Sequence, residues 1–310
     1  MGEFKHIPVL LNETIESLDI KKDGIYVDLT LGRGGHSEAI LSRLSSEGRL
    51  IGVDQDETAI KESEERLKKN FNNFTLVRSN FFHIDEILKD LGIEKVDGIL
   101  MDLGVSSPQF DDESRGFSYN YDSPLDMRMD QRNQLTAKEI VNTYSLKELT
   151  DIFQNYGEDK YSYSIAKNIV KEREIRPIET TFQLVDIIKR SKPQKELKKV
   201  GHPAKQIFQA LRIAVNDELR VLEETLWKAA SLLKSGGRLA VITFHSGEDK
   251  IVKKIFKELT VVEGNRYDLP LMEEKKEYNL ITRKGIKPSE EEIEYNHRSV
   301  SSVLRIIEKN

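Results

Sequence analysis

Cysteine is absent from the 310 residues, so disulfide bonds and zinc or iron–sulfur centres held by cysteine are excluded. Long apolar runs are also missing: no window approaches a membrane span, and the acid-containing start lacks the apolar core of a signal peptide. The net charge of −5 argues against indiscriminate nucleic-acid binding but allows a local basic patch. We therefore expect a soluble, cytoplasmic protein that makes no membrane contact.

Strand and helix patterns alternate over the first hundred residues. Short strands are predicted at 25–29, 49–54, 74–78, 96–102, 238–244 and 303–307. A polar, turn-rich stretch covers 106–130, and only helical patterns follow it up to about 204–233, where Gly236 and Gly237 are expected to stop the last helix. This order predicts a doubly wound α/β domain, residues 1–108 and 212–310, interrupted by an inserted α-helical domain, residues 109–211.

The stretch DLTLGRGGHS, residues 28–37, places three glycines behind the first strand and ahead of a helix. A strand, a glycine turn and a helix N-terminus favour a nucleotide site, because glycine lets a ligand approach the backbone. Asp54 ends the second strand, where an acid accepts hydrogen bonds from ribose hydroxyls. The spacing is not G-x-G-x-x-G, and Asp28 would repel a pyrophosphate, so the loop favours S-adenosylmethionine over NAD. A purely structural glycine turn is the alternative.

Acidic residues also end the other central strands. Asp102 closes the fourth strand, and open α/β sheets bind ligands at the carboxyl ends of their strands, so we expect Asp28, Asp54 and Asp102 to converge on one crevice. A metal site is disfavoured, because the glycine-rich backbone would crowd a hydrated magnesium ion and no His–carboxylate pair has ligand spacing.

A further polar group, TFHSGEDK, follows the strand at 238–244. His245 and Asp249 in this group would face the same crevice. A helix N-terminus also favours Ser, Glu and Asp, so a plain helix cap is an equal alternative. A Ser-His-Asp hydrolase is excluded, because the chain has no G-x-S-x-G motif.

Several blocks of the sequence point to one family. They are HIPVLLNETIESL, DLTLGRGGHS, GVDQD, MDLGVSSPQFDDESRGFSYNYDSPLDMRMD, YGEDKYSYSIA, HPAKQIFQALRIAVNDEL and FHSGEDKIVK. Together they resemble the RsmH (MraW) family of bacterial S-adenosylmethionine-dependent 16S ribosomal RNA (cytosine-N4)-methyltransferases, almost from end to end. The resemblance implies a class I methyltransferase domain with a helical insert that methylates a decoding-centre (P-site) cytosine in the small ribosomal subunit. Gly247, His297 and Val300 depart from the family pattern.

The resemblance also implies the residues of the site. The implied cofactor contacts are Gly34, Gly35, His36, Asp54, Phe81, Asp102 and Gln109, with Phe82 as an alternative to Phe81. Cytosine N4 is a poor nucleophile, so the enzyme needs acceptors for its hydrogens and an unstacked base. The candidates for catalysis are Asp102, Ser106, Ser107, His245 and Asp249. Candidate stacking partners are Phe110, Phe117 and Tyr119, with core packing as the alternative.

Basic residues gather at 187–205 against a single acid, Glu196. They are Lys189, Arg190, Lys192, Lys195, Lys198, Lys199 and Lys205. We expect this patch in the insert to track RNA phosphates, with ordinary solvated surface as the alternative. Rival functions are a nicotinamide-linked dehydrogenase and a non-catalytic ribosome-assembly factor, and a homodimer is left open.

Overall fold

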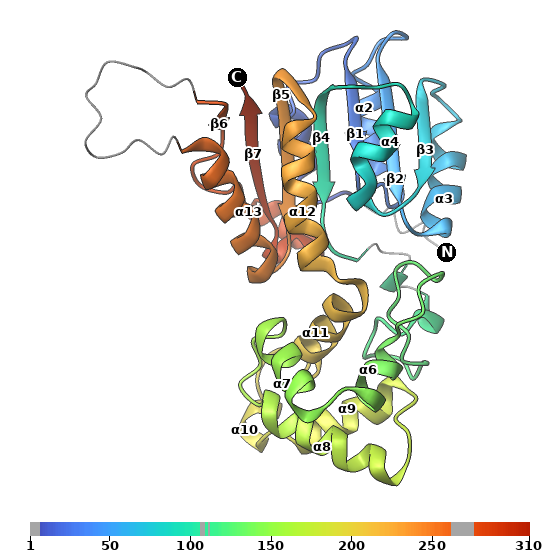
Figure 1. Cartoon of the computed structure of the whole chain (residues 1–310), viewed down its shortest axis with the longest axis vertical. Helices are drawn as coiled ribbons and strands as arrows, with labels where there is room; N and C mark the ends of the chain where they lie inside the picture. Colours follow the sequence, from blue (N-terminus) through green and yellow to red (C-terminus); the bar gives the residue numbers. More distant parts are fainter. Residues whose placement is uncertain (1–6, 106–108, 111, 262–275) are drawn as a thin grey trace, which may run out of the picture. The chain divides into compact units, whose positions relative to one another are not determined.

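The chain divides into two compact units in the computed structural model, which describes residues 7–105, 109–110, 112–261 and 276–310 (Figure 1). Unit 1 comprises Met1–Gly104 and Leu219–Asn310, and unit 2 comprises Val105–Glu218. The sequence predicts the second junction seven residues earlier, inside helix α11 (Lys205–Asn216). Helix α11 lies in unit 2 because its apolar side chains, such as Phe208 and Leu211, join the core of that unit.

Unit 1 is built on one mixed sheet, in which the described strands lie in the order β3-β2-β1-β4-β5-β7-β6. The strands are β1 (Ile25–Asp28), β2 (Arg49–Asp54), β3 (Phe74–Arg78), β4 (Val96–Asp102), β5 (Leu233–Thr243), β6 (Tyr278–Leu280) and β7 (Val303–Lys309). Strands β1 to β5 are parallel, and β7 is antiparallel to both of its neighbours. The order confirms the predicted doubly wound α/β fold and aligns the carboxyl ends of β1, β2 and β4.

Helices cover both faces of this sheet. The helices packed on one face are α1 (Leu11–Ser17), α2 (Gly35–Leu41) and α3 (Glu57–Leu67); on the other are α4 (Ile84–Asp90), α12 (Glu218–Ser231) and α13 (Ser246–Thr260). Alternate side chains of a strand supply the two cores: in β4, Ile99 and Met101 face one and Leu100 the other. The short helices η1 (Phe81–His83), α14 (Glu290–Tyr295) and η3 (His297–Ser301) lie in the connections.

Unit 2 is helical in its described part. Its helices are η2 (Glu113–Arg115), α6 (Ala137–Thr143), α7 (Leu146–Asn155), α8 (Ser162–Ile175), α9 (Thr181–Arg190), α10 (Gln194–Leu197) and α11. Thr180 caps α9 and forms a capping box with Gln183. Fully buried side chains such as Leu149, Phe153 and Ile165 give this unit its own core.

The expected helix stop at Gly236 and Gly237 is wrong. Helix α12 already ends at Ser231, and both glycines lie inside β5. The register of the β4–β5 pair shifts between Val96 and Gly98, and Gly236 has a φ of 73°, a backbone that glycine adopts at a bulge. Glycine here serves an irregular strand rather than a helix end.

The part of the polar stretch from 112 to 130 is held largely by its own arginines. The Arg115 guanidinium donates to the carbonyl oxygens of Arg128 and Met129 at 2.9 and 3.1 Å. Arg128 in turn binds both carboxylate oxygens of Asp126. This segment is therefore ordered by hydrogen bonds despite having little helix or strand. Among the described helices of the whole chain, none is both long and apolar enough to cross a membrane.

Candidate functional site

The glycine loop after β1 is held closed from two sides. Gly32 and Gly34 have φ values of 51° and 72°, the left-handed region that glycine adopts without strain. The Gly32 N–H donates to Asp54 Oδ2 at 2.9 Å, and its carbonyl accepts from Ser63 Oγ at 2.7 Å. Strand β2 and helix α3 thereby fix the loop shape.

Protein neighbours already account for the glycines at the start of α2. A Cβ atom built on Gly35 would lie 2.4 Å from Pro8 Cγ, and one on Gly34 would meet Ser63 Oγ at 3.2 Å. The sequence analysis attributed these glycines to the approach of a ligand. The structure adds a second reason, which is close packing against the N-terminal segment and α3.

Asp28 points into the protein. Its side chain is 1% exposed, and its carboxylate accepts from Ser37 Oγ at 2.7 Å and from the Thr30 N–H at 3.1 Å. Burial raises the pKa of this carboxyl, and the two hydrogen bonds only partly oppose that effect. Asp28 thus ties the glycine loop to α2 and adds negative charge beneath it.

Asp54, which ends β2, is partly exposed and supports the backbone on both sides. Besides Gly32, it accepts from the Asp56 N–H at 2.9 Å through Oδ1. Burial raises its pKa to about 6, and the neighbouring carboxylates of Asp56 and Asp28 act in the same direction. The Asp54 carboxyl therefore titrates close to neutral pH.

Asp102, which ends β4, has an open acceptor. Its Oδ1 atom is buried and has no hydrogen-bond partner among the described residues, and Oδ2 lies 3.6 Å from His36 Nδ1. Burial raises the pKa of Asp102 well above its usual value, and the charges of Asp28 and Glu248 raise it further. The negative charge of Asp28 thus acts on the carboxyls of both Asp54 and Asp102.

His36, in the first turn of α2, is 6% exposed and lies between Asp102 and the N-terminal segment. Its Nε2 atom is 3.0 Å from the Val9 carbonyl oxygen. A carbonyl only accepts hydrogen bonds, so Nε2 carries the proton and Nδ1 faces Asp102. His36 therefore connects the N-terminal segment to the end of β4.

His245 is the N-cap of α13. Its Nδ1 atom accepts from the Glu248 N–H at 3.4 Å, and the buried Glu248 carboxylate accepts from the Phe244 N–H at 2.7 Å. His245 Nε2 lies 3.2 Å from Glu248 Oε1. Because Nδ1 supplies its lone pair to the cap, the neutral ring carries its proton on Nε2, facing Glu248. The helix cap that the sequence offered as an alternative is present, and the Nδ1 atom of His245 takes part in it.

Asp249 is engaged by strand β7. Its carboxylate oxygens accept from Arg305 Nε and a terminal guanidinium nitrogen at 2.7 and 3.2 Å. Such a two-point pair fixes both side chains. Asp249 therefore joins the start of α13 to β7.

Phe81 and Phe82 follow β3 and have different surroundings. Phe81 packs against the core on the α4 side, whereas the Phe82 ring has Lys228 Nζ at 4.0 Å and the His83 ring at its edge. A cation over the Phe82 ring occupies one of its faces. Both rings therefore have protein neighbours, Phe81 in the core and Phe82 at Lys228 and His83.

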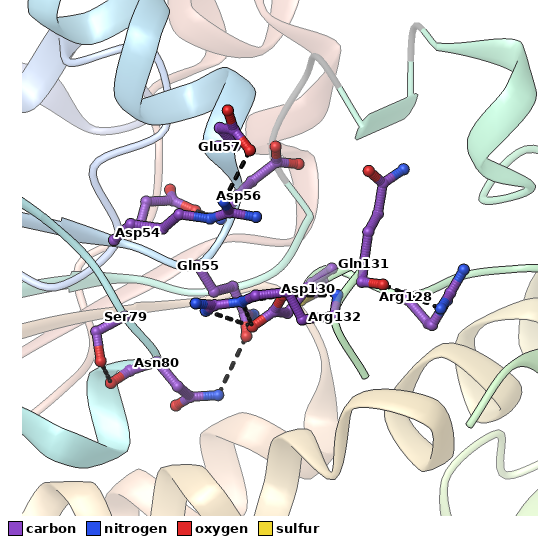
Figure 2. Close-up of polar contacts among 12 residues, drawn as sticks. Asp54, Gln55, Asp56, Glu57, Ser79, Asn80, Arg128, Asp130, Gln131 and Arg132 are labelled. Carbon is purple, nitrogen blue, oxygen red and sulfur yellow. Dashed lines mark hydrogen bonds and ion pairs between the residues drawn. The ribbon is translucent and has the colours of Figure 1, made fainter. Parts of the chain in front are cut away.

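Two residues that the sequence analysis missed link β2 to β3 (Figure 2). Gln55 Oε1 accepts from Asn80 Nδ2 at 3.1 Å, and Asn80 Oδ1 accepts from the Phe82 N–H at 2.9 Å. Their only sequence signal is their position directly after strand ends. They hold the two connections beside Asp54 in place.

The remaining candidate site residues belong to unit 2. Ser106, Ser107 and Pro108 lie outside the described residues. Gln109 is 4% exposed, and Phe110 is exposed at 37% with its ring centroid 6.4 Å from that of Phe117.

The other two candidate aromatics have protein partners. Phe117 is 4% exposed and belongs to the core of unit 2. Tyr119 stacks on the His202 ring at 4.3 Å between centroids. Phe117 is therefore a core residue, which was the alternative to a role in stacking. Of the three candidate aromatics, Phe110 is the one with an exposed side chain.

The basic segment at 187–205 divides into paired and exposed side chains. Lys192 is 7% exposed and binds Asp159 and the Pro203 carbonyl oxygen. Lys199 pairs with Glu196 at 2.7 Å, and Arg190 pairs with Glu172 at 3.3 Å. The exposed lysines for which the structure shows no ion pair in the described residues are Lys189, Lys195, Lys198 and Lys205.

Comparison with known proteins places this geometry in a family. The family model described as the MraW methylase family matches residues 3–310. A curated relative, ribosomal RNA small subunit methyltransferase H of Mesoplasma florum, is 55% identical over 98% of this chain and 99% of its own length.

Solved structures resemble the chain more distantly. An rRNA methylase of Streptococcus thermophilus has a TM-score of 0.43 at 12% identity, covering 96% of this chain and 93% of its own. A methyltransferase homologue of Pyrococcus horikoshii has a TM-score of 0.45 at 14% identity, with coverages of 97% and 66%. With TM-scores below 0.5, these two likenesses add nothing to the assignment.

Proposed function

Because the chain belongs to the MraW methylase family and is therefore a methyltransferase, we propose that it transfers the methyl group of S-adenosylmethionine to 16S rRNA. The relative from Mesoplasma florum is named for the small-subunit RNA as substrate. The acceptor that we propose is the N4 atom of a decoding-centre (P-site) cytosine, presented within the small ribosomal subunit in the cytoplasm. The observation that carries the proposal is the open Oδ1 acceptor of Asp102 beside a preformed glycine loop.

The charge of the site fits a cationic cofactor. Asp28, Asp54 and Asp102 end adjacent parallel strands, and the charge of Asp28 raises the pKa of both Asp54 and Asp102. A positive sulfonium and ammonium relieve this repulsion, whereas the pyrophosphate of a dinucleotide would add to it. The same argument disfavours the nicotinamide-linked dehydrogenase. When bound, S-adenosylmethionine supplies an electrophilic methyl group on sulfur.

The residues that would hold the cofactor follow from their positions. Asp54 would accept from the ribose hydroxyls, the backbone of Gly34 and Gly35 would line the loop, and Phe81 would stack on adenine. Gln109 and His36 would complete the contacts that the family resemblance implies. Each of these roles is a proposal for this chain.

Asp102 is the residue that we assign to the N4 hydrogens. As N4 forms its bond to the methyl carbon, the carbon–sulfur bond breaks, and N4 loses conjugation with the ring and must shed one proton. A positive charge beside Asp102 lowers the pKa of its carboxyl and so favours the ionised form. Its Oδ1 atom can then accept a hydrogen bond from N4 and take the excess proton. His245 is the weaker choice, because its Nδ1 atom is engaged in the helix cap and its Nε2 atom faces Glu248.

Unit 2 would recognise the RNA. The exposed lysines of segment 187–205 would contact phosphates, and Phe110 offers an exposed ring on which a base could stack. Phosphate contacts position a nucleic acid, whereas pocket contacts select the base. A net acidic protein can in this way bind RNA through one local surface.

The direct test uses small ribosomal subunits from cells that lack this enzyme. They are incubated with the purified protein and S-adenosylmethionine labelled on the methyl group, and the RNA is digested to nucleosides. The expected product is labelled N4-methylcytidine at a single position. Label on another nucleoside would overturn the N4 assignment, and an absence of label would favour the non-catalytic assembly factor.

A further inference from the structure

The N-terminal strap, residues 7–10, lies on the start of helix α2. Pro8 packs against Gly35, and the Val9 carbonyl oxygen accepts from His36 Nε2 at 3.0 Å. Leu10 is the N-cap of α1 and has a φ of 51°, a left-handed backbone that leucine adopts only at a cost. Other contacts must therefore hold the strap in this conformation.

Helix α14, near the other end of the chain, binds the strap at two points. The Leu10 N–H donates to Glu292 Oε1 at 2.8 Å in a buried bond, although 282 positions separate the two residues. The Asn296 side chain donates from Nδ2 to the Ile7 carbonyl oxygen at 3.1 Å. Glu292 itself is 5% exposed. The strap is thus fixed at its first and last residues by α14.

Glu292 departs from the local role that its position favours. Ser289 caps α14 by accepting from the Glu292 N–H at 3.1 Å, and a glutamate at this position usually returns its carboxylate to the cap backbone. Helix α7 closes such a box, with Glu148 accepting from the Ser145 N–H at 2.7 Å. In α14 the carboxylate instead binds Leu10. Helix capping therefore does not explain the position of the Glu292 side chain, whereas its hydrogen bond to the strap does.

We propose that Glu292 is a positioning residue for the cofactor site, a proposal that rests on the function proposed above. Its bond to Leu10 holds the Val9 carbonyl in place, and that carbonyl keeps His36 in the tautomer with its proton on Nε2. His36 Nδ1 then faces Asp102 Oδ2, 3.6 Å away. Glu292 thus sets the geometry of a site that it does not contact.

The test compares three substitutions on one helix. Glu292→Ala removes the acceptor for Leu10, Glu292→Gln keeps an oxygen that can accept, and Glu291→Ala removes an exposed glutamate from the same turn as a matched control. The measurements are the Kd of S-adenosylmethionine by calorimetry, kcat and KM, Tm, and the tautomer of His36 from its ring ¹⁵N shifts.

Glu292→Ala is expected to weaken cofactor binding by about tenfold and to raise KM for S-adenosylmethionine, with kcat at saturation within about twofold of the wild-type value. The ¹⁵N signals of His36 should move from one tautomer toward a mixture. Glu292→Gln should recover most of both effects, and Glu291→Ala should match the wild-type protein.

A milder variant guards against loss of folding. Asn296→Ala removes only the bond to Ile7 and should shift Kd in the same direction by a smaller factor. If Glu292→Ala lowers Tm but leaves both Kd and the His36 signals unchanged, Glu292 is only a structural residue and the proposal is wrong. Failure of the wild-type protein to bind S-adenosylmethionine would instead overturn the proposed function, and the His36 signals, which need no cofactor, distinguish the two failures.

Discussion

Asp54 combines two tasks in one carboxylate, since it holds the Gly32 and Asp56 backbone and is also proposed to hold the ribose of the cofactor. Its pKa of about 6 makes the second task sensitive to pH. Below that pKa the group is neutral and accepts only ordinary hydrogen bonds, whereas the ionised form accepts bonds about twice as strong. Cofactor binding should therefore strengthen as the pH rises through the pKa of Asp54.

Calorimetry from about pH 5 to about pH 8 tests this expectation. We expect the Kd of S-adenosylmethionine to fall by roughly tenfold over this range and to level off above pH 7. Asp54→Asn should remove the step near pH 6 and bind about one to two decades more weakly than the wild-type protein at the upper end. An unchanged pH profile in Asp54→Asn would show that another carboxyl is responsible.

Asp102→Asn tests the proposed proton acceptor. Asparagine preserves the shape and one acceptor oxygen of the side chain but cannot take a proton at neutral pH. We expect single-turnover methyl transfer to slow by about 10²–10⁴-fold while the Kd of the cofactor changes by less than about tenfold. His245→Gln is the comparison, and a larger loss of rate there would move the assignment to His245.

At the scale of elements, Lys192 and Asp159 join the segment after α9 to the turn before α8 through a buried ion pair. Lys192→Ala leaves the Asp159 carboxylate buried without its cation, which costs about 3–5 kcal/mol. Lys199→Ala is a matched control, because its pair with Glu196 is exposed and is worth less than about 1 kcal/mol. Urea unfolding followed by fluorescence measures both, and similar losses in the two variants would contradict this account.

The sequence predicted the elements whose signals are local. Strands β2, β3 and β4 match their predicted bounds, because short β-branched runs between turn residues are a strong pattern. Strand β6 and helix α14 were missed, since each is short and is stabilised by partners distant in the sequence. The glycines of β5 were misassigned because a bulge glycine and a helix-stop glycine look alike without the neighbouring strand.

Some residues of the candidate site could likewise be placed from the sequence, and others could not. Asp54 and Asp102 could be placed from the sequence because strand ends locate them, whatever the side chains around them. The cap role of His245 and the pairing of Asp249 with Arg305 could not, because both depend on which atoms approach after packing. The link from Glu292 to Leu10 has no sequence signal.

At the scale of the whole molecule, the acidic chain is expected to hold RNA through the exposed lysines of unit 2. A triple variant replaces Lys189, Lys195 and Lys198 by glutamine. We expect it to bind RNA more weakly than the wild-type protein, with an affinity that depends less on the salt concentration. Each lost phosphate contact reduces the salt slope by about 0.7–0.9. Cofactor binding should be unchanged, because none of these lysines is a proposed cofactor contact.

The control replaces Lys61, Lys68 and Lys147, which lie in exposed i,i+4 ion pairs on other helices. This variant loses the same charge. If the RNA contacts the lysines of segment 187–205 and not those of the control, the salt slope of the control should stay close to the wild-type value. Binding titrations at several salt concentrations give the slope. Equal slopes in the two triple variants would place the RNA on another surface.

The binding of α14 to the N-terminal strap, residues 7–10, also has a consequence for the order of events during synthesis. A chain leaves the ribosome from its N-terminus, so the glycine loop emerges early, whereas Glu292 and strand β7 come last. Until then β5 lacks its antiparallel neighbour, and the strap lacks its anchor. The nascent enzyme would thus bind its cofactor fully only after α14 and β7 have been synthesised and have packed against the earlier part of the chain.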